Sequence, residues 1–268
     1  MDDPFIIRLA ERNLRRHMTG VAACLAGMTV HERAGCALVD TGLASDTLNT
    51  VSGAPRHLLT SDDIRWVLDY YRERQLPFTW WVGPSDLWAG DALCAHGLAL
   101  SGIEMGMAGD LARLDLTAAG PGVDIRRATG LEGVMDHAGV VAAVVTPPDE
   151  ALLEFYRRAA DVITHASTDR HLFVLYEHGV PQSTVELCVS EHIVGLYAVA
   201  TRPSARGRGY ATTVAGQALR FARDTLDART VVLQSNPRAR SIYERIGLHA
   251  IGEFHEFVPE SAEEERAG

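Results

Sequence analysis

The sequence contains no lysine, although it has 268 residues and 25 basic side chains, all of them arginine. We attribute this absence to a coding bias rather than to function. Acidic residues outnumber basic ones and leave a net charge of −10. That balance argues against general binding of nucleic acid through a broad positive field.

Cysteine is also scarce. The four cysteines (Cys24, Cys36, Cys94 and Cys188) lack the spacing of a metal site, and so do the eleven histidines. We therefore predict reduced thiols and no metal. No run of residues is apolar and long enough to span a bilayer, and the N-terminus lacks the layout of a signal peptide. These absences favour a cytoplasmic protein that does not enter a membrane.

One stretch organises the rest of the chain. An apolar run over 193–201 leads into the glycine-rich sequence Arg206-Gly-Arg-Gly-Tyr-Ala211, and a helical pattern follows it. This order predicts a strand, a tight turn and a helix. Backbone N–H groups of such a turn converge with the helix N-terminus, so the stretch predicts an anion site that suits a phosphate.

The type of phosphate site follows from the spacing. The Gly-Lys-Ser/Thr ending of a P-loop is absent, and the glycines are too few for a dinucleotide-binding fold. The pattern Arg-x-x-Gly-x-Ala does resemble the signature of the GNAT superfamily of N-acetyltransferases. A second match follows at the family's usual distance, from Asn236 through Ala239, Tyr243 and Gly247 to Leu248, where the family usually has Phe.

The resemblance covers roughly residues 123 to 258 and implies that acetyl-CoA is the acyl donor. The turn would bind the pyrophosphate of coenzyme A, and the preceding strand would pair with the pantetheine arm. Asn236, before a proline, suits a helix N-cap and implies a further cofactor contact. The cofactor-binding residues implied by the resemblance are Val199, Ala200, Thr201, Arg206, Gly207, Arg208, Gly209, Tyr210, Ala211 and Asn236.

Two residues are candidates for acid–base catalysis. In the resembled family, the tyrosine at the position of Tyr243 points at the thioester sulfur, and a phenol can protonate a departing thiolate. The general base is left open, because Gly195 stands where several relatives carry a glutamate. Glu186 ranks first for that role, since apolar neighbours flank it on a strand, and Glu256 and His255 remain alternatives.

The expected fold is α/β, a mixed α+β sheet of the GNAT acyl-CoA N-acyltransferase type, with two lobes in tandem. The units Asp86…Gly97 and Asn236…Gly247 share their offsets, which suggests a weak internal repeat. The expected parts are a degenerate N-terminal lobe (1–116), a linker (117–122), a catalytic lobe (123–258) and an acidic tail (259–268). Trp80 and Trp81 are adjacent on a strand, so one of them should lie in the core.

The elements expected from periodicity and turn residues follow this division. Helices are expected over 4–18, from 61, over 86–97, 131–145 and 149–163, and after 211; strands are expected over 36–42, 77–84, 98–111, 123–129, 171–179 and 182–190.

The leading functional hypothesis is an acyltransferase that moves an acetyl group from acetyl-CoA to a primary amine of a small molecule. The amine would attack the thioester directly in a ternary complex. Two alternatives stay open. Some two-lobed relatives use aminoacyl-tRNA as the donor, and the arginines concentrated near the turn could hold more than a pyrophosphate. The missing glutamate also permits a non-catalytic CoA-binding module. The acceptor, the base and the oligomeric state do not follow from the sequence.

Overall fold

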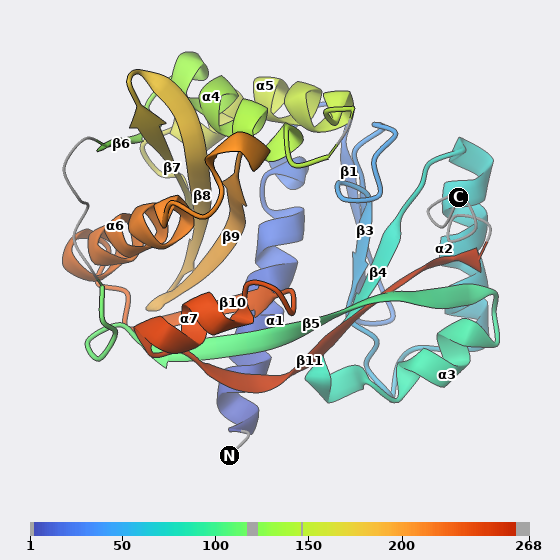
Figure 1. The fold of residues 1–268 in the computed structure, drawn as a ribbon. Helices are drawn as coiled ribbons and strands as arrows, with labels where there is room; N and C mark the ends of the chain where they lie inside the picture. The colour runs from blue at the N-terminus through green and yellow to red at the C-terminus, as the bar shows by residue number, and fades with distance from the viewer. Residues whose placement is uncertain (1–2, 117–122, 146, 261–268) are drawn as a thin grey trace. The chain divides into compact units, whose positions relative to one another are not determined.

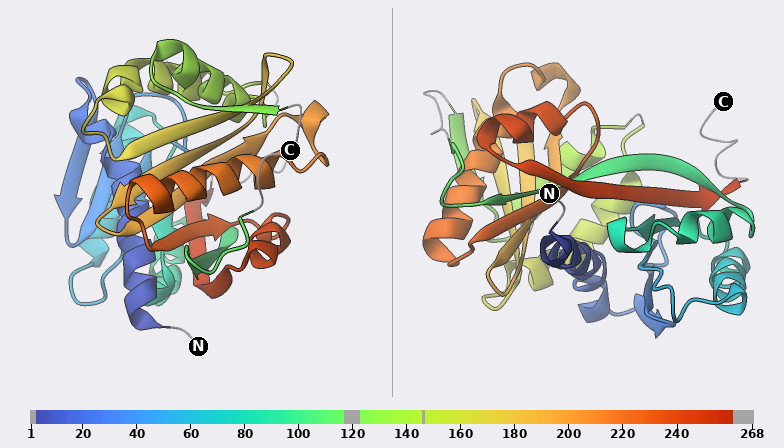
Figure 2. Two further views of the ribbon diagram at one scale, coloured as in Figure 1. Left: turned by 90° about the vertical axis from the view of Figure 1, so that its left-hand side faces the viewer. Right: turned by 90° about the horizontal axis from the view of Figure 1, so that it is seen from below.

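The structure is a computed structural model that describes residues 3–116, 123–145 and 147–260 (Figures 1 and 2). It contains two compact units. Unit 1 is formed by 1–106, 234–238 and 250–268, and unit 2 by 107–233 and 239–249, within the described residues. The expected linker, and all but two residues of the expected acidic tail, lie outside the described residues.

Unit 1 is an α/β unit whose strands follow the order β1-β2-β3-β4-β11-β5. The β3–β4 pair is parallel, whereas β2 and β11 run antiparallel to their neighbours β3 and β4. Its elements are α1 (Pro4–Thr19), η1 (Ala22–Cys24), β1 (Thr29–Arg33), β2 (Cys36–Asp40), β3 (Thr50–Ser52), α2 (Ser61–Arg74), β4 (Thr79–Val82), η2 (Pro84–Asp86), α3 (Ala89–Cys94), and most of β5 (Leu98–Asp110) and β11 (His249–Pro259).

The core of unit 1 lies between α2, α3 and the sheet. Trp80 is fully buried there, and its indole N–H donates to the carbonyl of Gly53 at 3.0 Å. Tyr71 stacks on Phe78 with ring centroids 4.3 Å apart. Trp81, the next residue on β4, is only half-buried, so the predicted split of the tryptophan pair is confirmed for the core member.

Unit 2 follows the strand order β5-β10-β9-β8-β7-β6. Strands β6 to β9 pair antiparallel in succession, with α4 and α5 between β6 and β7, and α6 connects β9 to the parallel strand β10. Its elements are β6 (Val123–Arg127), α4 (Leu131–Ala142), α5 (Glu150–Thr164), β7 (Arg170–Glu177), β8 (Val180–Ser190), β9 (Ile193–Thr201), η3 (Pro203–Ala205), α6 (Tyr210–Thr225), most of β10 (Thr230–Ser235), and α7 (Arg240–Ile246).

The helices of unit 2 cover opposite faces of its sheet. The rings of His171 and Phe173 on β7 meet Phe221 of α6, at 5.4 Å between centroids in both pairs. Tyr176 points to the other face, where its hydroxyl donates to Asp136 of α4 at 2.7 Å. Since side chains alternate along a strand, α6 lies on one face and α4 on the other (Figure 2).

The expected internal repeat has a structural counterpart. Strand β4, helix α3 and strand β5 form one copy, and β10, α7 and β11 form the other; Gly97 and Gly247 end both helices with positive φ, 85° and 106°. The copies exchange their last strands, because β11 pairs with β4 and β5 is the neighbour of β10. This exchange was not expected from the sequence.

Some local predictions differ from the structure. The expected helix over 86–97 is a 3₁₀ turn, Pro84–Asp86, followed by the short α3. Helix α7 starts at Arg240 with Ala239 as its N-cap, so Asn236 is not a cap. The amide of Ile242 bonds three residues back, to Ala239 at 2.9 Å, so the first turn is tight and begins later than the proline signal suggested. Strands β1 and β3 were not predicted.

Candidate functional site

The glycine-rich turn lies at the N-terminus of α6. Gly207 and Gly209 have φ of 79° and 76°, which side-chain-bearing residues rarely adopt, and a Cβ added at either would meet nothing within 4 Å. The turn is therefore exposed and has open space beside its backbone. The guanidinium Nε of Arg206 donates to the carbonyl of Thr201 at 3.4 Å, which ties the turn to the end of β9.

The N-terminus of α6 carries no internal cap. Its N-cap residue is Gly209, which has no side chain to accept a bond, and the first turn contains no acidic residue. Other helices cap themselves: Asp149 accepts from the amide of Leu152 at 3.0 Å at the start of α5. The first N–H groups of a helix lack partners within it and carry partial positive charge. An anion can therefore be accepted here without displacing a side-chain cap.

The strands on either side of α6 diverge. The pairing of β9 with β10 joins Ile193–Gly195 to Thr230–Val232 and ends there, although β9 continues to Thr201; both strands lie wholly within the described residues. Over Val199, Ala200 and Thr201, the edge of β9 that faces away from β8 therefore lies beyond the pairing with β10. An extended ligand could add to it as a strand does.

Strand β9 also contains a β-bulge, between Tyr197 and Ala200. The register with β8 shifts between Thr184 and Glu186, and Ala198 has φ of 45°, a left-handed conformation that costs energy for a residue with a Cβ. Such strain is found most often at functional sites. Nothing in the sequence marks Ala198, because alanine has no preference for positive φ.

Tyr243 lies on α7, in unit 2 with the turn and β9, and is 7 % exposed. A phenol so buried is shielded from bulk water. Asn236 falls in the segment of unit 1 that separates β10 from α7, and its carbonyl accepts from the hydroxyl of Ser235 at 3.0 Å. The structure does not test a cofactor contact for either residue, and both assignments remain proposals.

Glu186 is engaged in a buried network. Its carboxylate accepts from the Arg170 guanidinium at 2.5 Å and from the Tyr156 hydroxyl at 2.7 Å, and it is only 3 % exposed. His137 lies beside Tyr156, and burial lowers its pKa to about 4. The guanidinium of Arg170 stabilises the ionised form of Glu186, so this carboxylate would accept a proton only weakly. This disfavours Glu186 as the general base, and that role stays a prediction.

Glu256 lies in a different environment on β11. Burial, reinforced by the neighbouring charge of Glu104, raises its pKa to about 7. Burial also raises the pKa of Glu104 on β5. The Glu256 side chain lies over Gly102, where an added Cβ would approach the carboxylate to 3.2 Å. A carboxylic acid with this pKa exchanges its proton near neutral pH, which suits a general base.

In unit 1, α2 connects the parallel strands β3 and β4 as α6 connects β9 and β10, but β3 and β4 do not diverge. Strands β3 and β4 stay paired up to Ser52 and Trp81, and the amide of Gly53 still reaches the Trp81 carbonyl at 3.3 Å. Helix α2 is capped by Thr60 in a capping box with Asp63. Since a carboxylate already occupies this helix start, no phosphate is expected there.

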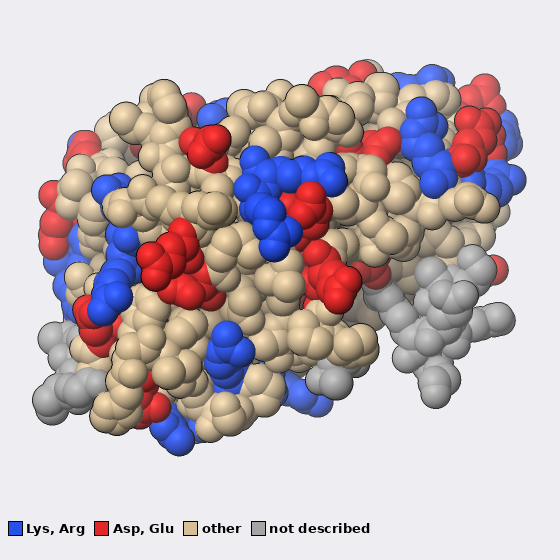
Figure 3. All heavy atoms as spheres, turned by 90° about the horizontal axis from the view of Figure 1, so that it is seen from above, with Lys and Arg blue, Asp and Glu red and all other residues tan. Residues whose placement is uncertain are grey.

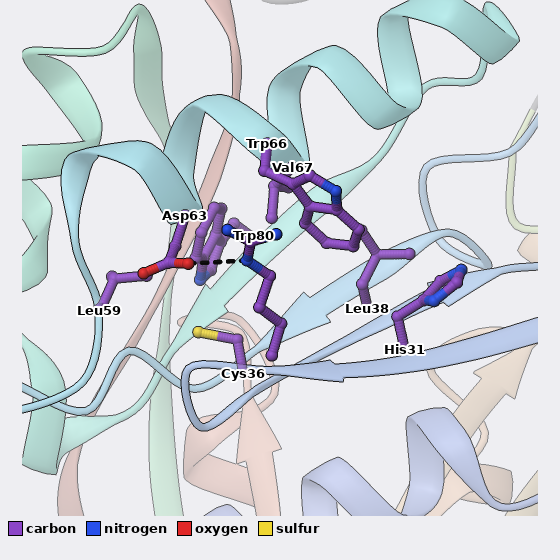
Figure 4. Close-up of a pocket in the computed structure, with 9 residues that line it drawn as sticks. His31, Cys36, Leu38, Leu59, Asp63, Trp66, Val67 and Trp80 are labelled. Carbon is purple, nitrogen blue, oxygen red and sulfur yellow. Dashed lines mark hydrogen bonds and ion pairs between the residues drawn. The ribbon is translucent and has the colours of Figure 1, made fainter.

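A small pocket adjoins that capped helix start (Figure 4). Trp66 and Trp80 form its aromatic walls, while Arg33 lies across it and donates to Asp63 at 2.7 Å. The same guanidinium lies 5.0 Å from the ring centroid of Trp66. The residues that line the pocket are His31, Arg33, Cys36, Leu38, Leu59, Asp63, Trp66, Val67 and Trp80.

Within residues 3–116, 123–145 and 147–260, no group of three or more His, Cys, Asp or Glu side chains is placed to hold a metal ion. No helix in the same part of the chain combines the length and apolar character needed to cross a membrane.

Comparisons with known proteins agree with this geometry. Residues 144–248 match the model of the acetyltransferase (GNAT) family. No curated protein matches the sequence. A GCN5-related N-acetyltransferase from Kribbella flavida has a similar fold, with a TM-score of 0.69 and 14 % identity over 93 % of this chain and 95 % of its own.

Two further solved structures are similar over most of their length. A GCN5-related N-acetyltransferase from Sphaerobacter thermophilus has a TM-score of 0.62 and 17 % identity, covering 95 % of this chain and 91 % of its own. A tandem GNAT protein from the clavulanic acid biosynthesis pathway has a TM-score of 0.58 and 12 % identity, covering 90 % and 86 %. The predicted two-lobed GNAT fold is therefore confirmed.

Proposed function

We propose that the protein transfers an acetyl group from acetyl-CoA to the primary amine of a small molecule, because residues 144–248 match the model of the acetyltransferase (GNAT) family. One observation carries the donor assignment: an uncapped helix start, with open space beside Gly207 and Gly209, next to a strand that has left its neighbour. These are the features that a pyrophosphate with an extended arm requires.

Different residues of unit 2 bind different parts of the donor. The N–H groups of Gly207 to Ala211 bind the phosphates of the donor, and Arg206 and Arg208 add positive charge. The backbone of Val199 to Thr201 pairs with the pantetheine arm and holds the thioester. An N–H group of the bulged strand polarises the thioester carbonyl as negative charge develops on its oxygen.

The chemical step is proposed as a direct attack. The neutral amine attacks the thioester carbon, so that the new C–N bond forms as the C–S bond breaks. Tyr243 gives its phenolic proton to the departing thiolate. A general base takes the surplus proton from the amine nitrogen, directly or through water, and Tyr243 regains a proton once the product has left and water enters the site.

Glu186, the carboxylate of unit 2 that the sequence ranked first for this role, is disfavoured as that base. It shares its charge with Arg170 in the protein interior, and the guanidinium lowers its affinity for a proton.

The alternative of an aminoacyl-tRNA donor has less support. Several arginines of the stretch 202–240 are paired with carboxylates: Arg208 with Glu177 at 2.8 Å, Arg223 with Asp224 at 2.7 Å, and Arg240 with Glu244 at 2.7 Å. On the face drawn in Figure 3, basic and acidic side chains are interspersed rather than gathered into one positive field. A polyanion as large as tRNA is expected to require such a field.

The test is product formation. Purified protein is incubated with acetyl-CoA and a panel of primary amines, while thiol release and the acetylated amine are followed by absorbance and mass spectrometry. We expect transfer to at least one amine, lost in Tyr243→Phe. Binding of acetyl-CoA without transfer to any amine would favour the non-catalytic module, and salt-sensitive binding of tRNA in place of acetyl-CoA would favour the tRNA donor.

A further inference from the structure

The phosphate turn is held by a carboxylate from another strand. Glu177, at the end of β7, accepts from the Arg208 guanidinium at 2.8 and 3.1 Å and from the Tyr210 hydroxyl at 2.5 Å. These two side chains flank Gly209, which has none. Two contacts from one carboxylate thus fix a turn that glycine would otherwise leave loose.

The same carboxylate neutralises the turn. Arg208 keeps half of its side chain exposed, and Glu177 a quarter, so both remain open to a ligand. Bonds from Tyr210 and Arg208 lower the pKa of Glu177, so the carboxylate remains ionised at neutral pH. An anion arriving at the helix start therefore meets a negative charge beside it and an arginine that already has a partner.

We propose that Glu177 is an internal counter-ion of the donor site, which competes with the phosphates of the donor for Arg208 and keeps the affinity for coenzyme A low. This role rests on the proposed function. Acetyl-CoA and the product coenzyme A share the same pyrophosphate, so the competition weakens both and speeds release of the product. Glu177 is a positioning residue, because it acts through Arg208 and Tyr210.

The two effects of Glu177 can be separated by substitution. Glu177→Gln keeps an oxygen that can accept from Arg208 and Tyr210 but removes the charge. Glu177→Ala removes both the charge and the acceptor. Glu154→Gln is the matched control, because Glu154 on α5 also pairs with two arginines, Arg157 and Arg158, each at 2.7 Å.

The experiment is calorimetric titration of the wild type and these variants with acetyl-CoA, coenzyme A and inorganic pyrophosphate at low salt. We expect Glu177→Gln to bind all three about threefold more tightly, the effect of removing one exposed counter-charge. Glu177→Ala should bind less tightly than Glu177→Gln, and Glu154→Gln should equal the wild type. Product release measured by stopped flow should slow in Glu177→Gln.

The outcomes distinguish this role from the proposed function. Unchanged or weaker binding by Glu177→Gln, with normal binding by the wild type, would overturn the counter-ion and leave the acetyltransferase standing. Tighter binding of pyrophosphate alone, without binding of acetyl-CoA, would support the counter-ion and overturn the donor. If neither pyrophosphate nor acetyl-CoA binds any form, both proposals fail.

Discussion

The guanidinium of Arg170 and the carboxylate of Glu186 form an ion pair at 2.5 Å in the interior of unit 2, where the two side chains are 2 % and 3 % exposed. A buried pair of this kind tolerates the loss of one partner poorly, because the other charge is left without compensation. The pair joins β7 to β8, one strand away from the bulged strand that is proposed to hold the thioester.

Glu186→Gln is therefore expected to affect stability more than chemistry. Its free energy of unfolding should fall by about 3 kcal/mol, the usual cost of breaking a buried pair. Urea denaturation gives this value, and kcat of the folded protein should stay within about tenfold of the wild type. A loss of kcat beyond about a thousandfold at unchanged stability would instead make Glu186 the general base.

Glu256 predicts a change of stability with pH. A carboxyl group whose folded pKa is raised prefers to be protonated in the folded state, so stability is lost as the pH rises from the ordinary value of 4.5 to about 7. Glu256→Gln should have a higher Tm than the wild type at pH 8 and a similar Tm at pH 4. Equal melting temperatures at both values would mean that Glu256 is not perturbed.

Tyr243→Phe separates chemistry from packing. The ring stays in its buried place on α7, so the free energy of unfolding should change by less than about 1 kcal/mol. Without the phenolic proton, kcat should fall by about a hundredfold to a thousandfold, with little change in the KM for acetyl-CoA. A fall confined to KM would indicate a binding role rather than proton donation.

The sequence specified the local parts of the site well. The strand, the turn over 206–211 and helix α6 follow from periodicity and glycine placement, which depend on neighbours along the chain. The uncapped start of α6 also follows from a local signal, because Gly209 has no side chain that could accept a hydrogen bond. The N-cap expected at Asn236 was wrong, because a proline signal locates a change of direction but not the residue where helical bonding begins.

Features that depend on long-range contacts were not predicted. The pairing of Glu177 with Arg208 joins residues 31 positions apart, and the Tyr156–Glu186 bond joins residues 30 apart. The exchange of β5 and β11 depends on which strands of the sheet lie beside each of them. Periodicity within a segment contains no information on such partners, so the sequence could not show that Glu186 is paired with Arg170 and Tyr156.

We propose that the start of α6 binds the phosphates of acetyl-CoA, and Gly209→Asp would interfere with this binding at the helix start itself. Aspartate tolerates positive φ and would place a carboxylate at the N-cap, as Asp63 does near the start of α2. Gly179→Asp is the matched control, since Gly179 has φ of 79° and equally open surroundings.

In calorimetric titration with acetyl-CoA, we expect micromolar binding by the wild type and by Gly179→Asp. Binding by Gly209→Asp should be weaker by about tenfold or more, and absent when Arg208→Glu is added. Equal affinity of the double variant and the wild type, or no binding by the wild type, would rule out a phosphate site at the start of α6.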